Sequence, residues 1–223
     1  MDAANKAGDF PGGRWIGINN SAGASIYEFD YNEDFSLAIW LKKTVPAGGN
    51  DFLFAKEGAG NQNQGYYLFR ETGSFGPAGA AWKMQTFQPE TAAIHDLAEL
   101  GPVDDGDWHL LVGTNNGGPA ASHALNDMEF YIDGVAVSKN IPGDNLNAAN
   151  TVKNLSALTI GSRENGSVPT SNAHLDEAAI WSRELSASDV AALWSAATTI
   201  PEPSSLILIL LGCSVLLSRR RSR

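Results

Sequence analysis

The feature that most constrains the fold is a succession of short apolar runs separated by clusters of glycine, asparagine, aspartate and proline. These runs lie at residues 25–29, 35–43, 52–57, 65–70, 80–87, 109–115, 128–138, 157–162 and 175–182. Short runs with turn residues between them are typical of β-strands. Asp133-Gly134 is a hairpin signal, because a type I′ turn needs positive φ at both central residues. The pattern predicts an all-β fold, an antiparallel β-sandwich.

One segment near the end departs from this pattern. Residues 185–197 read "LSASDVAALWSAA", with Ser186 as N-cap and Asp189 three residues later, which forms a capping box. Leu185 and Val190 occupy the hydrophobic staple positions, and Trp194 shares the apolar face of Val190. We expect one short C-terminal helix that closes one end of the sandwich.

The charge distribution bears on the class of partner. Of the 223 residues, 15 are Lys or Arg and 25 are Asp or Glu, and four of the arginines stand in the last five positions. The acidic body repels phosphate backbones, so we expect no nucleic-acid partner. The single cysteine, Cys213, lies in the tail, so residues 1–200 have neither a disulfide nor a thiol nucleophile.

The tail has three parts in a fixed order. The tripeptide Pro201, Glu202 and Pro203 comes first, an apolar run follows at 206–217, and the arginines Arg219, Arg220 and Arg221 close it. As a helix, the apolar run is about 18 Å long, whereas a bilayer core needs about 30 Å. We expect a short hydrophobic helix that inserts transiently through residues 204–218.

This tail resembles the PEP-CTERM sorting signal of Gram-negative bacteria. The resemblance implies an exosortase, a membrane-bound cysteine transpeptidase, as processing partner, together with exopolysaccharide production. It implies an exported protein that is anchored in the inner membrane before processing and then reaches the cell surface or extracellular matrix. The alternative is an ordinary membrane anchor. The start "MDAANKAGDFPGGRW" has no apolar signal-peptide region, and we expect a leader that this chain lacks.

The order of motifs in the body resembles the laminin-G-like, concanavalin A-like lectin/glucanase jelly roll. The marks that carry this resemblance are Phe35, Trp40, Trp108-His109, Tyr131 with Asp133-Gly134, Ile160-Gly161, Leu175-Asp176-Glu177 and Leu185-Ser186. We expect the jelly-roll domain at residues 1–197 and the linker and sorting tail at 198–223. The resemblance implies a carbohydrate-binding or adhesion module, with a polysaccharide or surface glycan as partner. The alternative is a non-catalytic protein-interaction or structural module.

An acidic motif offers a second alternative, an enzyme. Glu28, Asp30 and Glu33 have the E-x-D-x-x-E spacing of laminarinase-type glycoside hydrolases, where a bulged strand points three carboxylates to one face. In that family, apolar residues on the opposite face alternate with the carboxylates, and Asn32 departs from this pattern. The motif also lies at the start of the domain rather than on a central strand. We therefore expect no catalysis, and interpret the motif as an acidic strand edge and turn.

Two aspartates are candidate metal ligands. The resemblance implies one Ca²⁺ at the sandwich rim, with carboxylate oxygens from Asp176 and from Asp30 or, as an alternative, Asp34. Calcium takes six to eight oxygens, so backbone carbonyls would complete the shell. In the alternative interpretation, Asp176 caps a turn. The run Asp104, Asp105, Asp107 lacks EF-hand spacing and is interpreted as a solvated turn.

Trp82 and Gln85 are the candidate ligand-binding residues. They lie in the run 80–87, which could line a concave sheet, and sugars stack on aromatic faces while amides bond their hydroxyls. The alternative places Trp82 in the core. We expect core packing for the other tryptophans of the body's motifs, Trp40, Trp108, Trp181 and Trp194.

Overall fold

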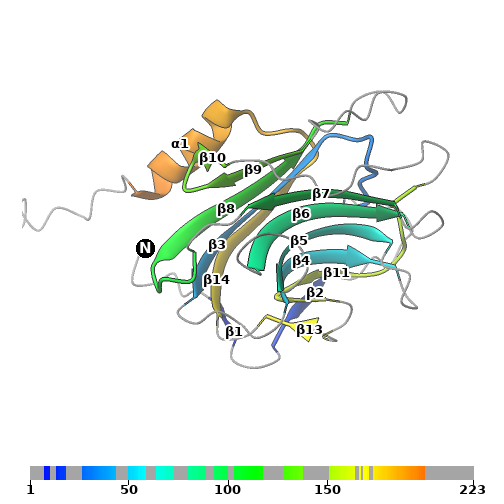
Figure 1. Cartoon of the computed structure of the whole chain (residues 1–223), viewed down its shortest axis with the longest axis horizontal. Helices are drawn as coiled ribbons and strands as arrows, with labels where there is room; N and C mark the ends of the chain where they lie inside the picture. Colours follow the sequence, from blue (N-terminus) through cyan, green and yellow to red (C-terminus); the bar gives the residue numbers. More distant parts are fainter. Residues whose placement is uncertain are drawn as a thin grey trace, which may run out of the picture.

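The computed structural model describes a β-sandwich with one helix (Figure 1). The described residues are 8–10, 14–18, 27–43, 50–58, 64–72, 80–88, 93–99, 103–117, 128–137, 151–163, 166, 168–170 and 173–198. Within them, no helix has the length and apolar character that a membrane crossing requires. The predicted sorting tail at 201–223 lies outside the described residues.

Two antiparallel sheets face each other. The first sheet has the order β1 (Gly8–Phe10), β14 (Ala173–Trp181), β3 (Phe35–Lys43), β8 (Trp108–Asn115), β9 (Met128–Ile132) and β10 (Val135–Ala136). The second has the order β2 (Ile16–Ile18), β11 (Leu158–Ile160), β4 (Asp51–Glu57), β5 (Gly65–Thr72), β6 (Ala80–Gln88) and β7 (Ala93–Glu99). A small hairpin pairs β12 (Ser162–Arg163) with β13 (Val168–Pro169). The predicted antiparallel sandwich is confirmed.

The main core fills the space between the sheets. Alternate residues of β3 belong to it, and all of them are fully buried: Phe35, Leu37, Ile39 and Leu41. They pack with residues of the second sheet such as Leu53, Tyr66, Leu68 and Met84. Successive side chains of a strand point to opposite faces, so Ala38 and Trp40 lie on the outer face of the first sheet.

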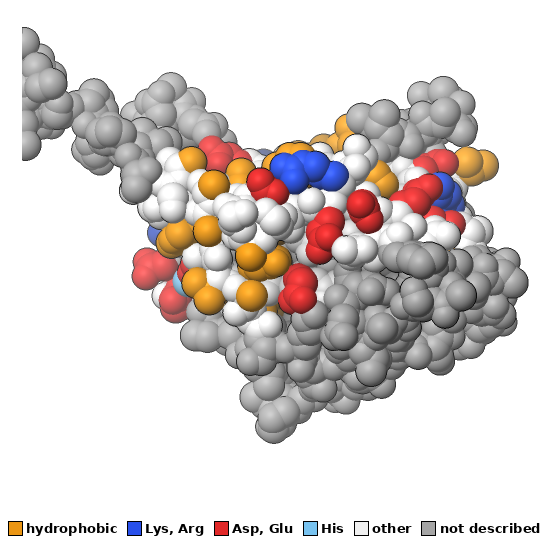
Figure 2. Space-filling view, turned by 90° about the horizontal axis from the view of Figure 1, so that it is seen from above, with side chains coloured by type: hydrophobic (Ala, Val, Ile, Leu, Met, Phe, Trp, Pro, Cys, Tyr) orange, Lys and Arg blue, Asp and Glu red, His pale blue; other side chains and the backbone are white. Residues whose placement is uncertain are grey.

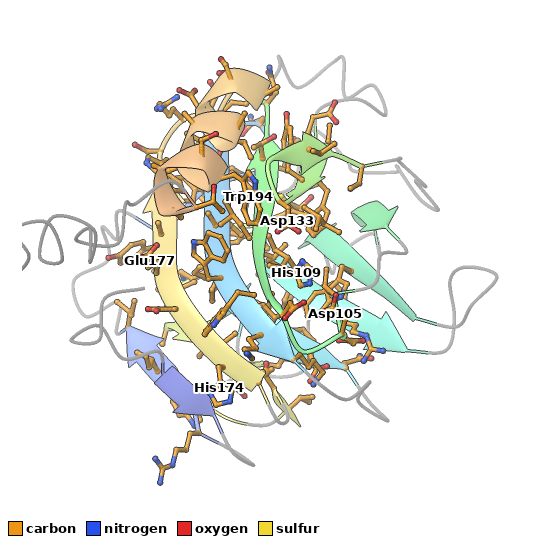
Figure 3. All side chains as sticks on the ribbon, turned by 90° about the vertical axis from the view of Figure 1, so that its left-hand side faces the viewer. Asp105, His109, Asp133, His174, Glu177 and Trp194 are labelled. Carbon is orange, nitrogen blue, oxygen red and sulfur yellow. The ribbon has the colours of Figure 1, made fainter. Side chains whose placement is uncertain are left out.

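Helix α1 (Ala187–Thr198) covers that outer face. It contributes Val190 and Trp194 to a second apolar cluster that includes Ala38, Trp40 and Leu110. The rings of Trp40 and Trp194 stack with centroids 5.3 Å apart. The predicted core packing of Trp40, Trp108, Trp181 and Trp194 is confirmed. The predicted position of the helix at one end of the sandwich is wrong, because its apolar face lies against the sheet (Figure 3).

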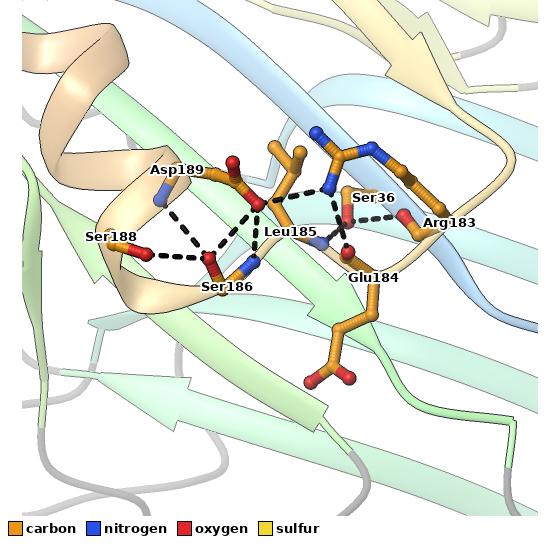
Figure 4. Close-up of polar contacts among 7 residues, drawn as sticks. All are labelled: Ser36, Arg183, Glu184, Leu185, Ser186, Ser188 and Asp189. Atoms are coloured by element: carbon orange, nitrogen blue, oxygen red, sulfur yellow. Dashed lines mark hydrogen bonds and ion pairs between the residues drawn. The ribbon is translucent and has the colours of Figure 1, made fainter.

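The start of α1 follows the predicted capping box (Figure 4). The Ser186 amide donates to Asp189 Oδ2 at 3.0 Å, and the Asp189 amide donates to Ser186 Oγ at 3.2 Å. A hydrogen bond from Arg183 is the main reason that the pKa of Asp189 falls to about 2. Ser36 of β3 donates to the Arg183 carbonyl and accepts from the Leu185 amide, both at 2.9 Å. These bonds fix the helix start to the central strand.

The Asp133-Gly134 turn between β9 and β10 also follows the prediction. Both residues have positive φ, 54° and 81°. A Cβ on Gly134 would lie 2.9 Å from the Cβ of Trp194. Glycine therefore serves both the turn and the close approach of the helix.

A buried ion network lies where β3 ends. Lys43 Nζ is 3.3 Å from Asp51 Oδ2, and Arg70 lies 3.5 Å from the same atom and 3.3 Å from Asp104 Oδ2. Lys43, Asp51 and Arg70 are each at most 5% exposed. Burial raises the pKa of Asp104 above its usual value. The predicted solvated turn at 103–107 is therefore only partly exposed, since Asp104 belongs to this network.

Several strand predictions need correction. A strand was expected at 25–29, but residues 27–29 lie outside any strand. The short edge strands β1 and β2 and the hairpin strand β13 were missed, because two or three residues give no periodic signal. The longer β7 was missed because "AIHDLAE" is rich in alanine and acidic residues, which strands disfavour.

Candidate functional site

Polar loops gather where β3 begins and β8 ends. We call the segments 27–34, 115–117, 151–156 and 183–184 the polar rim. Figure 2 views the molecule from above and shows more acidic than basic side chains on the described part of that face. The rim rests on the core, because Phe29 is buried and its ring stacks on Phe35 with centroids 5.0 Å apart.

Asp30 joins two of these segments. Its Oδ1 accepts hydrogen bonds from the amides of Tyr31 and Val152, each at 2.9 Å, and its Oδ2 accepts from Thr151 Oγ1. Residues 27–34 form turns rather than the bulged strand that the glycoside-hydrolase alternative required. The glycoside-hydrolase alternative, in which Glu28, Asp30 and Glu33 share one strand face, does not fit this conformation. The favoured interpretation as an acidic strand edge and turn is confirmed for the turn and wrong for the strand edge.

Glu33 reinforces the same junction. Its carboxylate accepts from the Asp30 amide at 2.9 Å and from Lys153 Nζ at 2.6 Å. Burial alone would raise the pKa of Glu33, but the hydrogen bonds from Lys153 and Asp30 outweigh it and lower that pKa. Among the described contacts, the carboxylates of Asp30 and Glu33 thus hold the loops together.

Hydrogen bonds between Lys56 of β4 and Asn154 connect the rim to the second sheet. Lys56 is 2% exposed, and its Nζ donates to Asn154 O and Ser156 O at 2.6 Å and to Asn154 Oδ1 at 3.1 Å. Asn154 Nδ2 donates to the carbonyls of Lys56 and Gln64. Burial lowers the pKa of Lys56 to about 8. The sequence signal of this contact is a lysine inside the apolar run 52–57.

The 115–117 loop completes the rim. Asn115 Nδ2 donates to the carbonyls of Tyr31 and Glu33, both at 2.9 Å. Asn116 Nδ2 donates to Glu184 at 2.8 Å, and the Gly117 amide donates to Asp34 at 2.7 Å. The result is a set of interlocked loops on which Asn32, Asp34 and Asn116 are exposed.

Asp176 lies elsewhere, on β14 opposite Trp40 of β3. Asp30 precedes Phe35, where β3 begins, and the five residue steps from Phe35 to Trp40 span about 17 Å of strand. The structure therefore does not bring the two predicted calcium ligands together. Asp176 Oδ1 accepts from the Glu177 amide at 2.9 Å, so the alternative interpretation holds for the backbone hydrogen bond. It is wrong for the turn, because both residues lie within strand β14.

Calcium does not fit the residues at either aspartate. Both carboxylate oxygens of Asp30 already accept hydrogen bonds. The residues that surround a pocket at Asp176 are mostly aliphatic, whereas calcium needs six to eight oxygens. No group of three or more metal-ligating side chains occurs among the described residues.

The two predicted sugar-binding residues lie on β6. Trp82 is 2% exposed and belongs to the core between the sheets, so its predicted stacking role is wrong and the core alternative is confirmed. Gln85 pairs in register with Tyr67 of β5 and Asp96 of β7. The side chain of Gln85 lies outside the described ones, so its predicted role stays a prediction.

His109 forms a second polar cluster beside the Asp133-Gly134 turn (Figure 3). Its Nδ1 lies 2.8 Å from Asp133 Oδ2, and its Nε2 lies 3.0 Å from Asp105 Oδ1. Burial alone would lower the pKa of His109, but the two aspartate hydrogen bonds outweigh it and raise that pKa. The imidazole ring thus links the turn before β8 to the hairpin turn after β9.

Comparisons with known proteins agree with this architecture. The model of the concanavalin A-like lectin/glucanases superfamily matches residues 17–191, so the chain belongs to that family. No curated protein matches the sequence.

Three solved binding domains have a similar fold. The binding domain of Paraclostridial Mosquitocidal Protein 1 is 17% identical, with a TM-score of 0.56 over 86% of this chain and 46% of that one. The Botulinum neurotoxin serotype G binding domain is 13% identical, with a TM-score of 0.55 over 88% and 48%. The serotype D ligand binding domain, solved with N-acetylneuraminic acid, is 16% identical, with a TM-score of 0.53 over 82% and 39%. This chain spans less than half of each.

Asp30 is expected to hold the rim in place. The variant Asp30→Ala leaves the amide of Val152 and the hydroxyl of Thr151 without their acceptor, and we expect it to lower the free energy of unfolding by about 1–3 kcal/mol. The control Asn32→Ala changes an exposed residue of the same turn and should stay within about 0.5 kcal/mol of wild type. Urea denaturation measures both. Equal stability of the two variants would contradict the proposed role of Asp30.

His109 is expected to make stability depend on pH. Its pKa is raised in the folded state, so its contribution is complete below the unfolded value of about 6.5 and is lost as pH rises through the folded value. His109→Gln should therefore flatten the decline in unfolding free energy that wild type shows from pH 6 upward. An unchanged slope in His109→Gln would refute the linkage.

Proposed function

We propose that the chain is an exported carbohydrate-binding module whose ligand lies on the polar rim. The observation that carries this proposal is the rim itself, in which loops distant in sequence are fixed by Asp30, Asn115 and Asn154 while other polar groups stay exposed. Family membership and the binding-domain relatives, one of them complexed with N-acetylneuraminic acid, support the same class of function.

The chemistry of the exposed groups suits sugars. Asn32 and Asn116 offer amide donors and acceptors, and Asp34 offers a carboxylate acceptor. Sugar hydroxyls pair with such groups, and binding residues are often carried by loops on a rigid scaffold. Preorganised loops also reduce the ordering cost of binding.

The charge of the rim narrows the ligand class. Its acidic residues are Glu28, Asp30, Glu33, Asp34 and Glu184. Its two basic residues, Lys153 and Arg183, already pair with Glu33 and Asp189. An acidic surface repels acidic sugars and favours neutral or cationic ones. We therefore propose neutral or amino-sugar-containing polysaccharides as ligands, rather than polymers rich in uronic acids.

The tail supports an export route for this module. Pro201-Glu202-Pro203, the short apolar run and the arginine cluster support processing by an exosortase. In this proposal, residues 204–218 hold the protein at the inner membrane until the tail is removed. The module then acts at the cell surface or in the extracellular matrix.

Polysaccharide binding tests the proposed ligand class. In pull-down and glycan-array assays, the full chain should bind neutral or amino-sugar polymers equally in calcium and in excess chelator. Replacing Asn32 and Asn116 together with alanine should weaken binding at least tenfold, about 1.4 kcal/mol. The control Val135→Ala changes an exposed residue of the β9–β10 hairpin and should bind as wild type does. A blank panel, or a preference for uronic-acid polymers, would contradict the proposal.

Processing of the tail tests the export route. The chain, preceded by a signal peptide, should lose its tail in a Gram-negative host that has an exosortase and keep it in a host without one. Changing Pro201, Glu202 and Pro203 to alanine should leave the uncut form in the membrane, as immunoblotting of membrane and culture fractions would show. Thr199→Ala is the matched control. Equal processing of the triple variant and wild type would refute the sorting role.

A further inference from the structure

Trp15 differs from the other tryptophans that the structure describes. It is the only one of them that is exposed, with 37% of its surface accessible, whereas the others are buried or partly buried. It directly precedes β2, the edge strand of the second sheet. Large apolar side chains are mostly buried, because water disfavours their surface. An exposed indole that the fold also holds in one place is therefore a candidate contact surface.

Two glycines make room for the two ends of this indole. A Cβ on Gly17 would lie 2.5 Å from Cζ3 of the six-membered ring. A Cβ on Gly166, in the turn between β12 and β13, would collide with Nε1 of the five-membered ring. Gly166 also has a φ of 91°, which favours glycine. The ring is thus seated between β2 and the small hairpin, whose strand β13 lies near β2 in Figure 1.

The described neighbours of the ring are backbone rather than aliphatic side chains. Gly17 lies on the same side of β2 as the indole, whereas Ile16 points to the other side and lines a pocket between the sheets. Within the described part of the chain, β2 pairs with β11 alone. The other edge of β2 therefore carries peptide groups that bond no described strand, and Ile16 and Gly17 are both exposed.

We propose that Trp15 is a stacking site for a sugar ring, separate from the polar rim. A sugar lays its C–H face on an aromatic ring and directs its hydroxyls to polar groups beside it. The flat indole and the peptide groups of β2 supply both kinds of contact. The ligand class rests on the proposed function, but the site itself includes no rim residue.

A protein partner fits this surface less well. The central residues of a protein interface are surrounded by further contacts that exclude water, whereas Ile16, the exposed apolar neighbour of Trp15, points away from the ring. Strand addition is also disfavoured, because β2 has three residues and very short edge strands resist pairing with another chain. A sugar ring on the indole requires neither feature.

Trp15 lies at the end of β2 that is away from the rim. Ile18 pairs with Leu158, which follows the rim segment 151–156 closely, and Ile16 pairs with Ile160. The three residue steps from Ile18 to Trp15 add about 10 Å of chain. Two separate sites let one module contact a polysaccharide twice or link two of them.

Titrations of the full chain with cellohexaose, laminarihexaose and chitohexaose, three neutral probes, test the site. NMR follows the indole N–H signal of Trp15, which is assigned by its loss in Trp15→Tyr, and the amide signal of Gly166. We expect at least one probe to shift both signals. The Gly166 amide then reports the affinity in every variant.

Variants test whether the flat ring and its seat are needed. Trp15→Leu keeps apolar bulk without a ring, and should weaken the affinity about fivefold or more, whereas Trp15→Tyr should stay within about threefold of wild type. Gly17→Ala keeps Trp15 but displaces its ring, and should weaken binding as Trp15→Leu does. The control Gly58→Ala, at a glycine whose Cβ would meet nothing closer than 3.4 Å, should bind as wild type does.

The proposal would be overturned if no probe shifts the Trp15 signal, or if Trp15→Leu or Gly17→Ala binds as tightly as wild type. The double replacement of Asn32 and Asn116 by alanine separates the two sites, because it should leave the Gly166 shift unchanged. Loss of that shift in the double variant would contradict a separate site. Unchanged polysaccharide capture by the double variant, with the Trp15 effects intact, would remove the rim proposal alone.

Discussion

The structure depends on a central strand that is buried on both faces. Along β3, Phe35, Leu37, Ile39 and Leu41 face the second sheet, while Trp40 faces helix α1. A strand covered on only one side would leave the Trp40 indole on the surface, so the helix is needed as much as the opposite sheet. Ser36 completes this arrangement, because its hydroxyl binds the chain just before the helix.

The two ends of β3 have different polar surroundings. Where the strand ends, Lys43, Asp51 and Arg70 form a buried network that fixes charge inside the sandwich. Buried ion pairs contribute little net stability but are costly to break, so this end is suited to structure. Where the strand begins, the acidic residues cap loops and stay near the surface. The rim therefore combines fixed backbone with accessible polar groups, which is the arrangement a binding site needs.

The sequence predicted those parts of the fold in which local pattern and tertiary packing agree. The long strands, the Asp133-Gly134 turn and the Ser186–Asp189 capping box all have strong local signals. The acidic motif shows the limit: the run 25–29 predicted a strand that ends just before Asp30, whereas residues 27–34 form turns. Asp30 accepts hydrogen bonds there from Thr151 and Val152, more than a hundred residues away. Trp82 shows another limit, because the alternation of side chains along a strand does not tell which face of the strand lies inward. The roles of Lys56 and Asn154 also depend on distant partners.

Hydrogen exchange tests the central claim, that ligand binds at the polar rim, most directly. Amide exchange of the full chain would be measured by mass spectrometry with and without a polysaccharide that the chain captures. The account predicts added protection in segments 27–34 and 115–117, with little change in the hairpin of β9 and β10. Protection confined to the outer face of β14 or to the hairpin, with the rim unchanged, would contradict it.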